Sequence, residues 1–274
     1  MAFSSGSRIN TNIAAYNALN ALNNVSRDLS VHQLRLSTGK KINSASDDAS
    51  GYVISKKMEA RVNSLQAAVD NIGDAQSMLG VAEGGYQTVA DLLTSIKSDV
   101  TKANDGSYTD EEKQALVDEV GQMMDEINNI GAQTQFNGTT LVDGSYNQSF
   151  QVGETSSQLM TISLSANADA TTLLGQDSTT LTTANITSLT VDSALSTIDS
   201  QIGKIGAMEN RLSIKESNLN TAITNTQAAQ SRIEDADVAS EQISSVKDQI
   251  LQQTATAQLA QANKSPQVFL SLFQ

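Results

Sequence analysis

The sequence predicts a mainly α-helical fold, in which long helices from both termini pack as an antiparallel coiled coil and small β-hairpins lie in the middle. Three observations support this fold class. Apolar residues recur at steps of three and four through both terminal thirds of the chain. The 274 residues include one proline, so few positions interrupt a helix. Aromatic residues make up 4% of the chain, fewer than a compact globular core usually contains.

The first helix is predicted from an apolar stripe near the N-terminus. The stripe consists of Ile9, Ile13, Tyr16, Leu19, Leu22, Val25 and Leu29. A polar break over residues 37–41 separates it from a second helix, which we expect to begin near Ser46. Asp47 and Asp48 would then lie in the first turn, where carboxylates complement the helix dipole. We therefore favour a helix start for this pair over a pair of acid–base catalysts.

Two further helices are predicted before the middle of the chain. The second helix has the stripe Ile54, Met58, Val62, Leu65, Val69, Ile72 and Leu79. An unbroken helix over residues 47–103 would span roughly 85 Å. Thr109 and Glu112 form a capping-box pattern at the start of a third helix. Its apolar positions are Leu116, Val120, Met123, Ile127 and Ile130. This spacing indicates a seam packed as a coiled coil.

The middle of the chain changes to a β pattern. The dipeptides Asn137–Gly138 and Asp143–Gly144 are typical of hairpin turns. Apolar and polar residues alternate in two short segments, around Phe150 and Val152 and around Met160, Ile162 and Leu164. These segments are predicted to be strands with one buried face. Residues 166–190 are rich in Thr, Ser and Asn without a strong period, and we interpret them as a surface loop with room for one more strand.

The C-terminal third returns to a helical pattern. Its heptad-spaced positions are Leu195, Ile198, Ile202, Ile205, Leu212, Leu219 and Ile223. A second helix is expected over residues 236–263, where residues 249–263 carry no charge. Because a solvated helix normally carries Lys and Glu, this uncharged face indicates contact with other chains or with a lumen. Pro266 is expected to end the helix, ahead of the apolar tail Val268, Phe269, Leu270, Leu272 and Phe273.

Composition excludes several classes of function. The net charge is −13 without a basic stripe, so we expect no nucleic-acid partner. No apolar run approaches the ~20 residues of a membrane helix, so we expect no membrane partner either. With no Cys and one His, His32, which is expected on a helix surface, the chain lacks the usual ligands of a zinc site. We therefore expect no catalytic residue, no metal and no cofactor. The N-terminus lacks a signal-peptide pattern, and the residues alone would predict a cytoplasmic protein.

The apolar stripe of the N-terminal helix predicts that copies of the chain assemble with one another. One partner helix would leave most of the N-terminal stripe half exposed to water, so several neighbours are needed to bury it. We therefore expect cooperative assembly, with termini disordered in the free monomer. A contact between different patches on successive copies generates a helical filament unless the rotation closes a ring.

Particular motifs go beyond periodicity. Residues 36–51, with the sequence LSTGKKINSASDDASG, resemble the signature of the N-terminal region of bacterial flagellins. Six further motifs resemble segments of the same family. They are INTNIAA at 9–15, QTQFNG at 133–138, FQVG at 150–153, SRIEDAD at 231–237, ILQQ at 250–253 and QANKSP at 261–266. The motifs occur in the family's order and cover both ends of the chain.

The resemblance implies a short flagellin with four segments. Residues 1–44 would form an N-terminal helix and linker of the inner D0 layer, and residues 233–274 the C-terminal D0 helix. Residues 45–190 would supply the helices, hairpins and surface loop of the surrounding D1 rod, and residues 191–232 its C-terminal helix. The outer domains of longer flagellins would be absent.

The resemblance also implies location and partners. The chain would be an extracellular subunit of the flagellar filament, exported unfolded through a type III apparatus without a cleaved signal peptide. This expectation replaces the cytoplasmic one. Its partners would be other copies of itself, an export chaperone on the C-terminal region, and the flagellar cap and hook–filament junction proteins.

Two sets of residues are predicted to carry the structural role. The self-assembly residues of the inner tube would be Ile9, Ile13, Tyr16, Leu22, Val25, Leu29, Ile250, Leu251, Leu259, Val268, Leu270 and Leu272. The core of the D1 rod would be Ile54, Met58, Val62, Leu65, Val69, Ile72, Leu116, Val120, Ile127, Ile198, Ile202, Ile205 and Leu212.

A motif that innate Toll-like receptors recognise in some flagellins has diverged. Where those family members have two arginines and a leucine, this chain has Ser95, Lys97 and Asp99. Glu119 matches a family glutamate nearby. We therefore expect weak receptor recognition.

Three alternatives remain beside the filament subunit. A hook–filament junction protein would share the terminal helices but form a single ring. A secreted enzyme or adhesin with flagellin-like ends would need a sizeable inserted domain, which this chain lacks. A cytoplasmic coiled-coil scaffold should carry charge along all its surface faces, and residues 249–263 do not.

Overall fold

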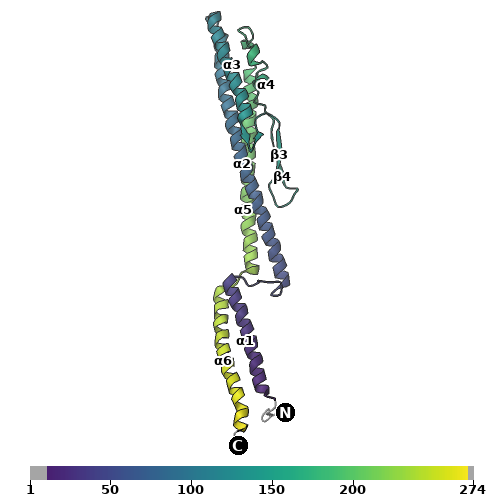
Figure 1. Cartoon of the computed structure of the whole chain (residues 1–274). Coiled ribbons are helices and arrows are strands. Elements are labelled where there is room, and N and C mark those ends of the chain that lie inside the picture. The colour runs from purple at the N-terminus through teal and green to yellow at the C-terminus, as the bar shows by residue number, and fades with distance from the viewer. Residues whose placement is uncertain (1–10, 271–274) are drawn as a thin grey trace. The chain divides into compact units, whose positions relative to one another are not determined.

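The computed structural model describes residues 11–270, and it divides into two compact units (Figure 1). Unit 1 combines the chain up to Ala60 with the chain from Thr226 onward, and unit 2 is Arg61–Asn225. These divisions differ from the segment boundaries expected at 44/45 and 232/233. The start of the second helix and the end of the fifth belong to unit 1 because their residues bond to the linker after the first helix.

Unit 1 contains helix α1 (Ile13–Thr38) and helix α6 (Val238–Leu270) side by side (Figure 1). Asn12 caps the start of α1, since its side-chain oxygen accepts a hydrogen bond from the backbone N–H of Ala15 at 3.0 Å. Gly39 ends α1 in the left-handed conformation, at φ +70°. The prediction that Pro266 ends the last helix was wrong: α6 keeps helical backbone past it to Leu270. Proline has no backbone N–H, so the helix continues there without one hydrogen bond of its ladder.

Helix α2 (Ala49–Ala103) begins slightly later than expected. Asp48 lies just before the helix, where its carboxylate accepts hydrogen bonds from the backbone N–H groups of Ser50 and Gly51, both at 3.0 Å. Asp47 holds the preceding turn by accepting from the backbone of Asn43 and Ser44. The interpretation of the pair as a helix start is thus confirmed, although both residues precede the first turn instead of lying in it.

Unit 2 is built around α2, α3 (Asp110–Gln133) and the first part of α5 (Val191–Glu234). The predicted capping box of α3 is confirmed, with Thr109 and Glu112 bonding to each other's backbone N–H. Apolar side chains from all three helices meet in one buried core. The largest side chain fully buried in that core is Tyr86, whose hydroxyl donates to the carbonyl oxygen of Ala166 at 2.6 Å.

The predicted strands of the middle are confirmed. Strands β1 (Gln135–Phe136) and β2 (Thr139–Thr140) pair across Asn137 and Gly138, which take φ values of +50° and +79°. Strands β3 (Tyr146–Gln151) and β4 (Leu159–Leu164) form a second antiparallel pair. In β4 every second residue is buried, namely Met160, Ile162 and Leu164. Asp143–Gly144 does not turn a hairpin, because β2 and β3 do not pair with each other.

The expected surface loop over 166–190 is wrong in part. It contains α4 (Ala170–Leu174) and two short 3₁₀ turns, η1 (Ser178–Thr180) and η2 (Ile186–Ser188), and no strand. Several of its apolar side chains are buried in the core: Leu173, Leu174, Leu181, Ile186 and Leu189. The segment therefore covers the core. Because its backbone is irregular, its buried residues follow no helical or strand period.

Candidate functional site

The pairing of α1 with α6 is antiparallel and has a defined register. Near its open end, the side-chain amide of Asn12 donates to the carbonyl oxygen of Ala262 at 2.7 Å. Further along, the side-chain amide of Gln252 donates to the Ser26 hydroxyl at 3.1 Å. The two chain ends thus form one helical pair, as the apolar stripes predicted.

A charged cluster bridges the same two helices. The single histidine, His32, contacts Glu241 through Nδ1, and its Nε2 lies 3.6 Å from the Asp248 carboxylate. Arg35 donates to the second oxygen of Glu241 at 3.2 Å. Burial would raise the pKa of Glu241, but the hydrogen bond with His32 and the charge of Arg35 lower it below its usual value. The expectation that His32 lies on a helix surface missed this role in pairing α1 with α6.

Backbone bonds close the other end of the pair. The N–H of Lys41 donates to the carbonyl oxygen of Glu234 at 2.6 Å, and the N–H of Ala236 donates to the carbonyl oxygen of Gly39 at 2.9 Å. Lys40 and Asp235 form an isolated antiparallel bridge. The linker after α1 is therefore fastened to the junction between α5 and α6.

The Glu234 side chain is the centre of this junction and is only 8% exposed. Its carboxylate accepts hydrogen bonds from Lys40 Nζ at 2.5 Å, Ser55 Oγ at 2.5 Å and Gln230 Nε2 at 3.0 Å. Burial alone would raise its pKa. The three hydrogen bonds and the charge of Lys40 outweigh burial and lower the pKa from 4.5 to about 2. The carboxylate is thus held ionised at neutral pH.

Unit 1 leaves much of its apolar surface uncovered. Among its described residues, the buried large apolar residues are Leu29 and Ile42. At least 40% of the residue surface is exposed at Ile13, Tyr16, Leu19, Leu34, Val53, Ile54, Val238, Ile243, Val246, Ile250 and Leu251. This exposed apolar surface is therefore available for contact with another molecule.

The predicted self-assembly residues fall into three groups. Ile13, Tyr16, Ile250 and Leu251 are exposed, Leu22, Val25 and Leu259 are half-buried, and Leu29 is buried between α1 and α6. Val268 and Leu270 lie in the last turns of α6. Ile9 and Leu272 lie outside the described residues.

Most residues expected in the rod core lie in or against the core of unit 2. Leu65, Ile72, Val120, Ile127, Ile198, Ile205 and Leu212 are buried, and Val62, Val69, Leu116 and Ile202 pack half-buried against them. Met58 is half-buried in unit 1. Ile54 corrects the expectation, because it lies in unit 1 and is 43% exposed. Ser55, one residue later on α2, is buried and donates to Glu234 of α5, so Ile54 lies away from that contact.

The diverged receptor positions lie along α2 and α3. Ser95 and Glu119 are exposed. Lys97 pairs with Asp192 of α5 at 2.5 Å. Asp99 is buried and accepts a hydrogen bond from Lys102 at 2.8 Å. The Ser95 hydroxyl also donates to the backbone carbonyl oxygen of Asp91 at 3.1 Å, so Ser95, Lys97 and Asp99 are all engaged within the chain.

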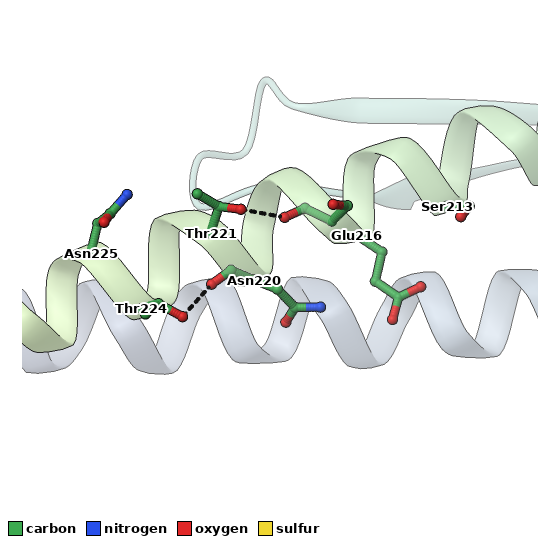
Figure 2. Close-up of a pocket in the computed structure, with 7 residues that line it drawn as sticks. Ser213, Glu216, Asn220, Thr221, Thr224 and Asn225 are labelled. Atoms are coloured by element: carbon green, nitrogen blue, oxygen red, sulfur yellow. Dashed lines mark hydrogen bonds between the residues drawn. The ribbon is translucent and has the colours of Figure 1, made fainter.

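Figure 2 shows a shallow groove on α5 of unit 2. It is lined by Ser213, Glu216, Ser217, Asn220, Thr221, Thr224 and Asn225. The hydroxyls of Thr221 and Thr224 each donate to a backbone carbonyl four residues earlier. Glu216 is the one carboxylate that lines this groove. The groove thus offers mainly hydroxyl and amide groups to whatever contacts it.

The described part of the chain has neither a cluster of metal-binding side chains nor a helix suited to span a membrane. No group of three or more metal-binding side chains comes together between residues 11 and 270. No helix within that range has both the length and the apolar character of a membrane span.

Comparisons with known proteins agree on one family. A model of the bacterial flagellin N-terminal helical region matches residues 9–147, and a model of the bacterial flagellin C-terminal helical region matches residues 189–273. The flagellin of Bacillus subtilis is 33% identical, and the match covers 97% of this chain and all of that protein.

Two further similarities extend the comparison. The flagellar filament core protein flaB2 of Brachyspira hyodysenteriae is 34% identical, over 97% of this chain and 99% of its own length. The solved structure of a putative flagellar hook-associated protein from Vibrio parahaemolyticus superposes with a TM-score of 0.57 at 14% identity, covering 69% of this chain and all of that one. At that identity the second likeness concerns the fold alone.

Proposed function

Because the chain belongs to the bacterial flagellin family and is a structural subunit of a flagellar filament, we propose that it polymerises through the paired helices α1 and α6. The observation that carries this proposal is the exposed apolar surface of unit 1. Full burial of one large aliphatic side chain contributes about 1.5–3 kcal/mol. Several such side chains, covered on every copy, would make assembly strongly favourable.

The proposal assigns layers to the two units. Unit 1, with the self-assembly residues on α1 and α6, would form the inner tube, and unit 2 would form the surrounding layer. The uncharged stretch at 249–263 would face neighbouring copies or the central channel, where no charge has to be desolvated. This structural role requires no catalytic residue and no cofactor.

Seeded polymerisation of the purified chain tests the proposal. The full chain should extend filament seeds, and a chain lacking residues 236–274 should not. Growth that stops at single rings would instead favour a hook–filament junction protein. No feature of the described structure favours that alternative.

A matched pair of substitutions sharpens that test. Ile243 is 72% exposed on α6, and Ile243→Asp should stop extension because a charge would have to be buried between copies. Ser240→Asp introduces the same charge in the first turn of α6, where the helix dipole favours it, and should leave extension intact. Equal growth of both variants would contradict a role for the exposed face of α6.

Other partners follow from the same exposed surface. Until assembly covers α6, an export chaperone would shield its C-terminal region, and the flagellar cap and hook–filament junction proteins would contact the growing and basal ends. Export would proceed unfolded, without a cleaved signal peptide. Mass spectrometry of exported chains tests whether a signal peptide is cleaved. Cleavage behind an N-terminal leader would contradict the proposal.

Weak recognition by an innate Toll-like receptor is also proposed. The diverged residues Ser95, Lys97 and Asp99 replace two arginines and a leucine, and Lys97 and Asp99 are held in ion pairs. A receptor reporter assay with monomer should give a weak response, and the triple variant S95R/K97R/D99L a stronger one. A full receptor response to the unchanged monomer would contradict this proposal.

A further inference from the structure

The core-facing seam of α5 contains one glutamine among apolar residues. Steps of three and four along this seam connect Val191, Ala194, Ile198, Gln201, Ile205, Met208 and Leu212. Gln201 is only 1% exposed, and its side-chain nitrogen Nε2 is buried without a hydrogen-bond partner among the described residues. The other buried polar residue of unit 2, Asp99, does have a partner, Lys102. Because buried polar groups are normally hydrogen-bonded, the Gln201 amide requires an acceptor from outside the chain.

A hollow beside Gln201 has room for such an acceptor. It has a volume of about 310 Å³ and lies between the end of β4 and the first part of α5. Its lining residues are Ser165, Ala166, Ser196, Thr197, Ser200, Gln201 and Lys204. The three serines and Lys204 are exposed, so a solute can enter from the surrounding water.

The polar groups that remain available in the hollow are mainly donors. Lys204 belongs to none of the ion pairs among the described residues. None of the described residues that line the hollow is an aspartate or a glutamate. The carbonyl oxygen of Ala166 already accepts a hydrogen bond from the Tyr86 hydroxyl at 2.6 Å. An ammonium, an amide and three serine hydroxyls therefore remain, and this set matches a negatively charged ligand with several acceptor oxygens.

We propose that the hollow binds a small tetrahedral oxyanion, such as inorganic phosphate or sulfate, between the Gln201 amide and the Lys204 ammonium. Ser165, which follows β4, and Ser196 and Ser200 on α5 would supply further hydrogen bonds. A bound anion would link the end of β4 to α5 and thereby stabilise unit 2. The proposal does not depend on polymerisation, because every residue of the site belongs to one chain.

The side-chain amide signals of Gln201 report binding directly. In ¹H–¹⁵N NMR spectra of the full chain as a monomer, Q201L identifies these signals by their loss. Phosphate should shift them to a saturating value, whereas NaCl at equal ionic strength should leave them in place. Signals that stay in place, or that move equally in NaCl, would overturn the proposal and leave water as the partner of the amide.

Removal of the positive charge tests the second contact. K204Q should bind phosphate roughly tenfold more weakly, because the anion loses a charge-assisted hydrogen bond. K215Q removes another cation about three turns further along α5, outside the lining of the hollow, and should bind as the unchanged chain does. Equal affinities of K204Q and K215Q would contradict the assignment of Lys204.

Acetate tests the chemical class of the ligand. A carboxylate side chain of another protein offers two oxygens, as acetate does, and acetate should bind more weakly than phosphate. Tighter binding of acetate would overturn the choice of a tetrahedral anion.

Thermal melts separate a ligand site from a glutamine that only sets the register of the helices. Phosphate should raise the Tm of the unchanged chain more than that of Q201L, because only the unchanged chain keeps the complete site. Phosphate also favours the folded state of proteins in general by exclusion from their surface. Equal increases in Tm would mean that this general effect is the whole effect, and the proposal would fail.

Discussion

At the scale of single residues, Glu234 shows how a buried charge can be stabilising. Its carboxylate accepts hydrogen bonds from Lys40, Ser55 and Gln230, which lie far apart in the sequence. Because the pKa falls from 4.5 to about 2, the ionised form is favoured by about 3 kcal/mol in the folded state. The contribution is complete above pH ~4.5 and is lost as the pH falls through about 2.

Glu234→Gln should therefore loosen the junction at pH 7 and matter little in acid. The opening free energy, measured by hydrogen exchange at the Lys41 and Ala236 amides, should drop by about 3 kcal/mol at pH 7. The difference from the unchanged chain should shrink between pH 4.5 and 2. Asp91→Asn, at an exposed carboxylate on α2, is the control. A difference that stayed constant with pH would mean that the charge is not the cause.

At the scale of elements, close packing of α3 depends on Gly131. A Cβ atom there would lie 2.6 Å from the carbonyl oxygen of Ala168, a backbone atom that cannot swing aside. Gly80 of α2 is also in a helix, but a Cβ atom there would meet nothing within 4 Å. Both glycines therefore lie within a helix, but a side chain would clash at Gly131 and would find open space at Gly80.

Alanine at these two positions should have opposite effects. Gly131→Ala should destabilise unit 2 by about 1–3 kcal/mol through the clash. Gly80→Ala should stabilise it by up to about 1 kcal/mol, because alanine loses less conformational entropy in a helix. Urea unfolding followed by circular dichroism measures both, and destabilisation by Gly80→Ala would contradict the open space beside it.

Elements specified by local chemistry could be predicted from the sequence. The capping box at Thr109 and Glu112 and the turn at Asn137–Gly138 depend on residues three or fewer positions apart. The Glu234 cluster could not be predicted, because Ser55 and Glu234 lie 179 positions apart and no periodic pattern marks either. Likewise, the buried leucines of 166–190 follow no helical or strand period, so composition alone suggested a surface loop.

Site prediction shows the same division. The apolar stripe of the first helix and the uncharged face of the last predicted self-assembly residues, and of these Ile13, Tyr16, Ile250 and Leu251 are exposed. A stripe cannot show how much of itself one partner helix covers. For that reason Ile54, assigned to the rod core by its period, is 43% exposed.

At the scale of the whole molecule, the two units should differ in stability. Unit 2 has a continuous buried core from Leu65 to Ile223, whereas the described part of unit 1 buries Leu29 and Ile42. Local stability follows the density of buried apolar contacts. The isolated chain should therefore open first in α1 and α6.

Hydrogen exchange on monomer and filament measures this difference. Amides of α1 and α6 should exchange quickly in the monomer, while those of α2 and α3 inside unit 2 are protected. In the filament, protection should extend to α1 and α6, because neighbouring copies then cover them. Protection of α1 and α6 already equal to that of α2 in the monomer would contradict the prediction.

The antiparallel pairing of α1 and α6 has a mechanical consequence. Since Asn12 and Ala262 meet at the open end of the pair, a pull applied between the two chain ends would load its contacts one after another, as in a zipper. The helices would peel apart at low force past His32 and Glu241. The last contacts to carry load would be the linker's backbone bonds to Glu234 and the bridge between Lys40 and Asp235.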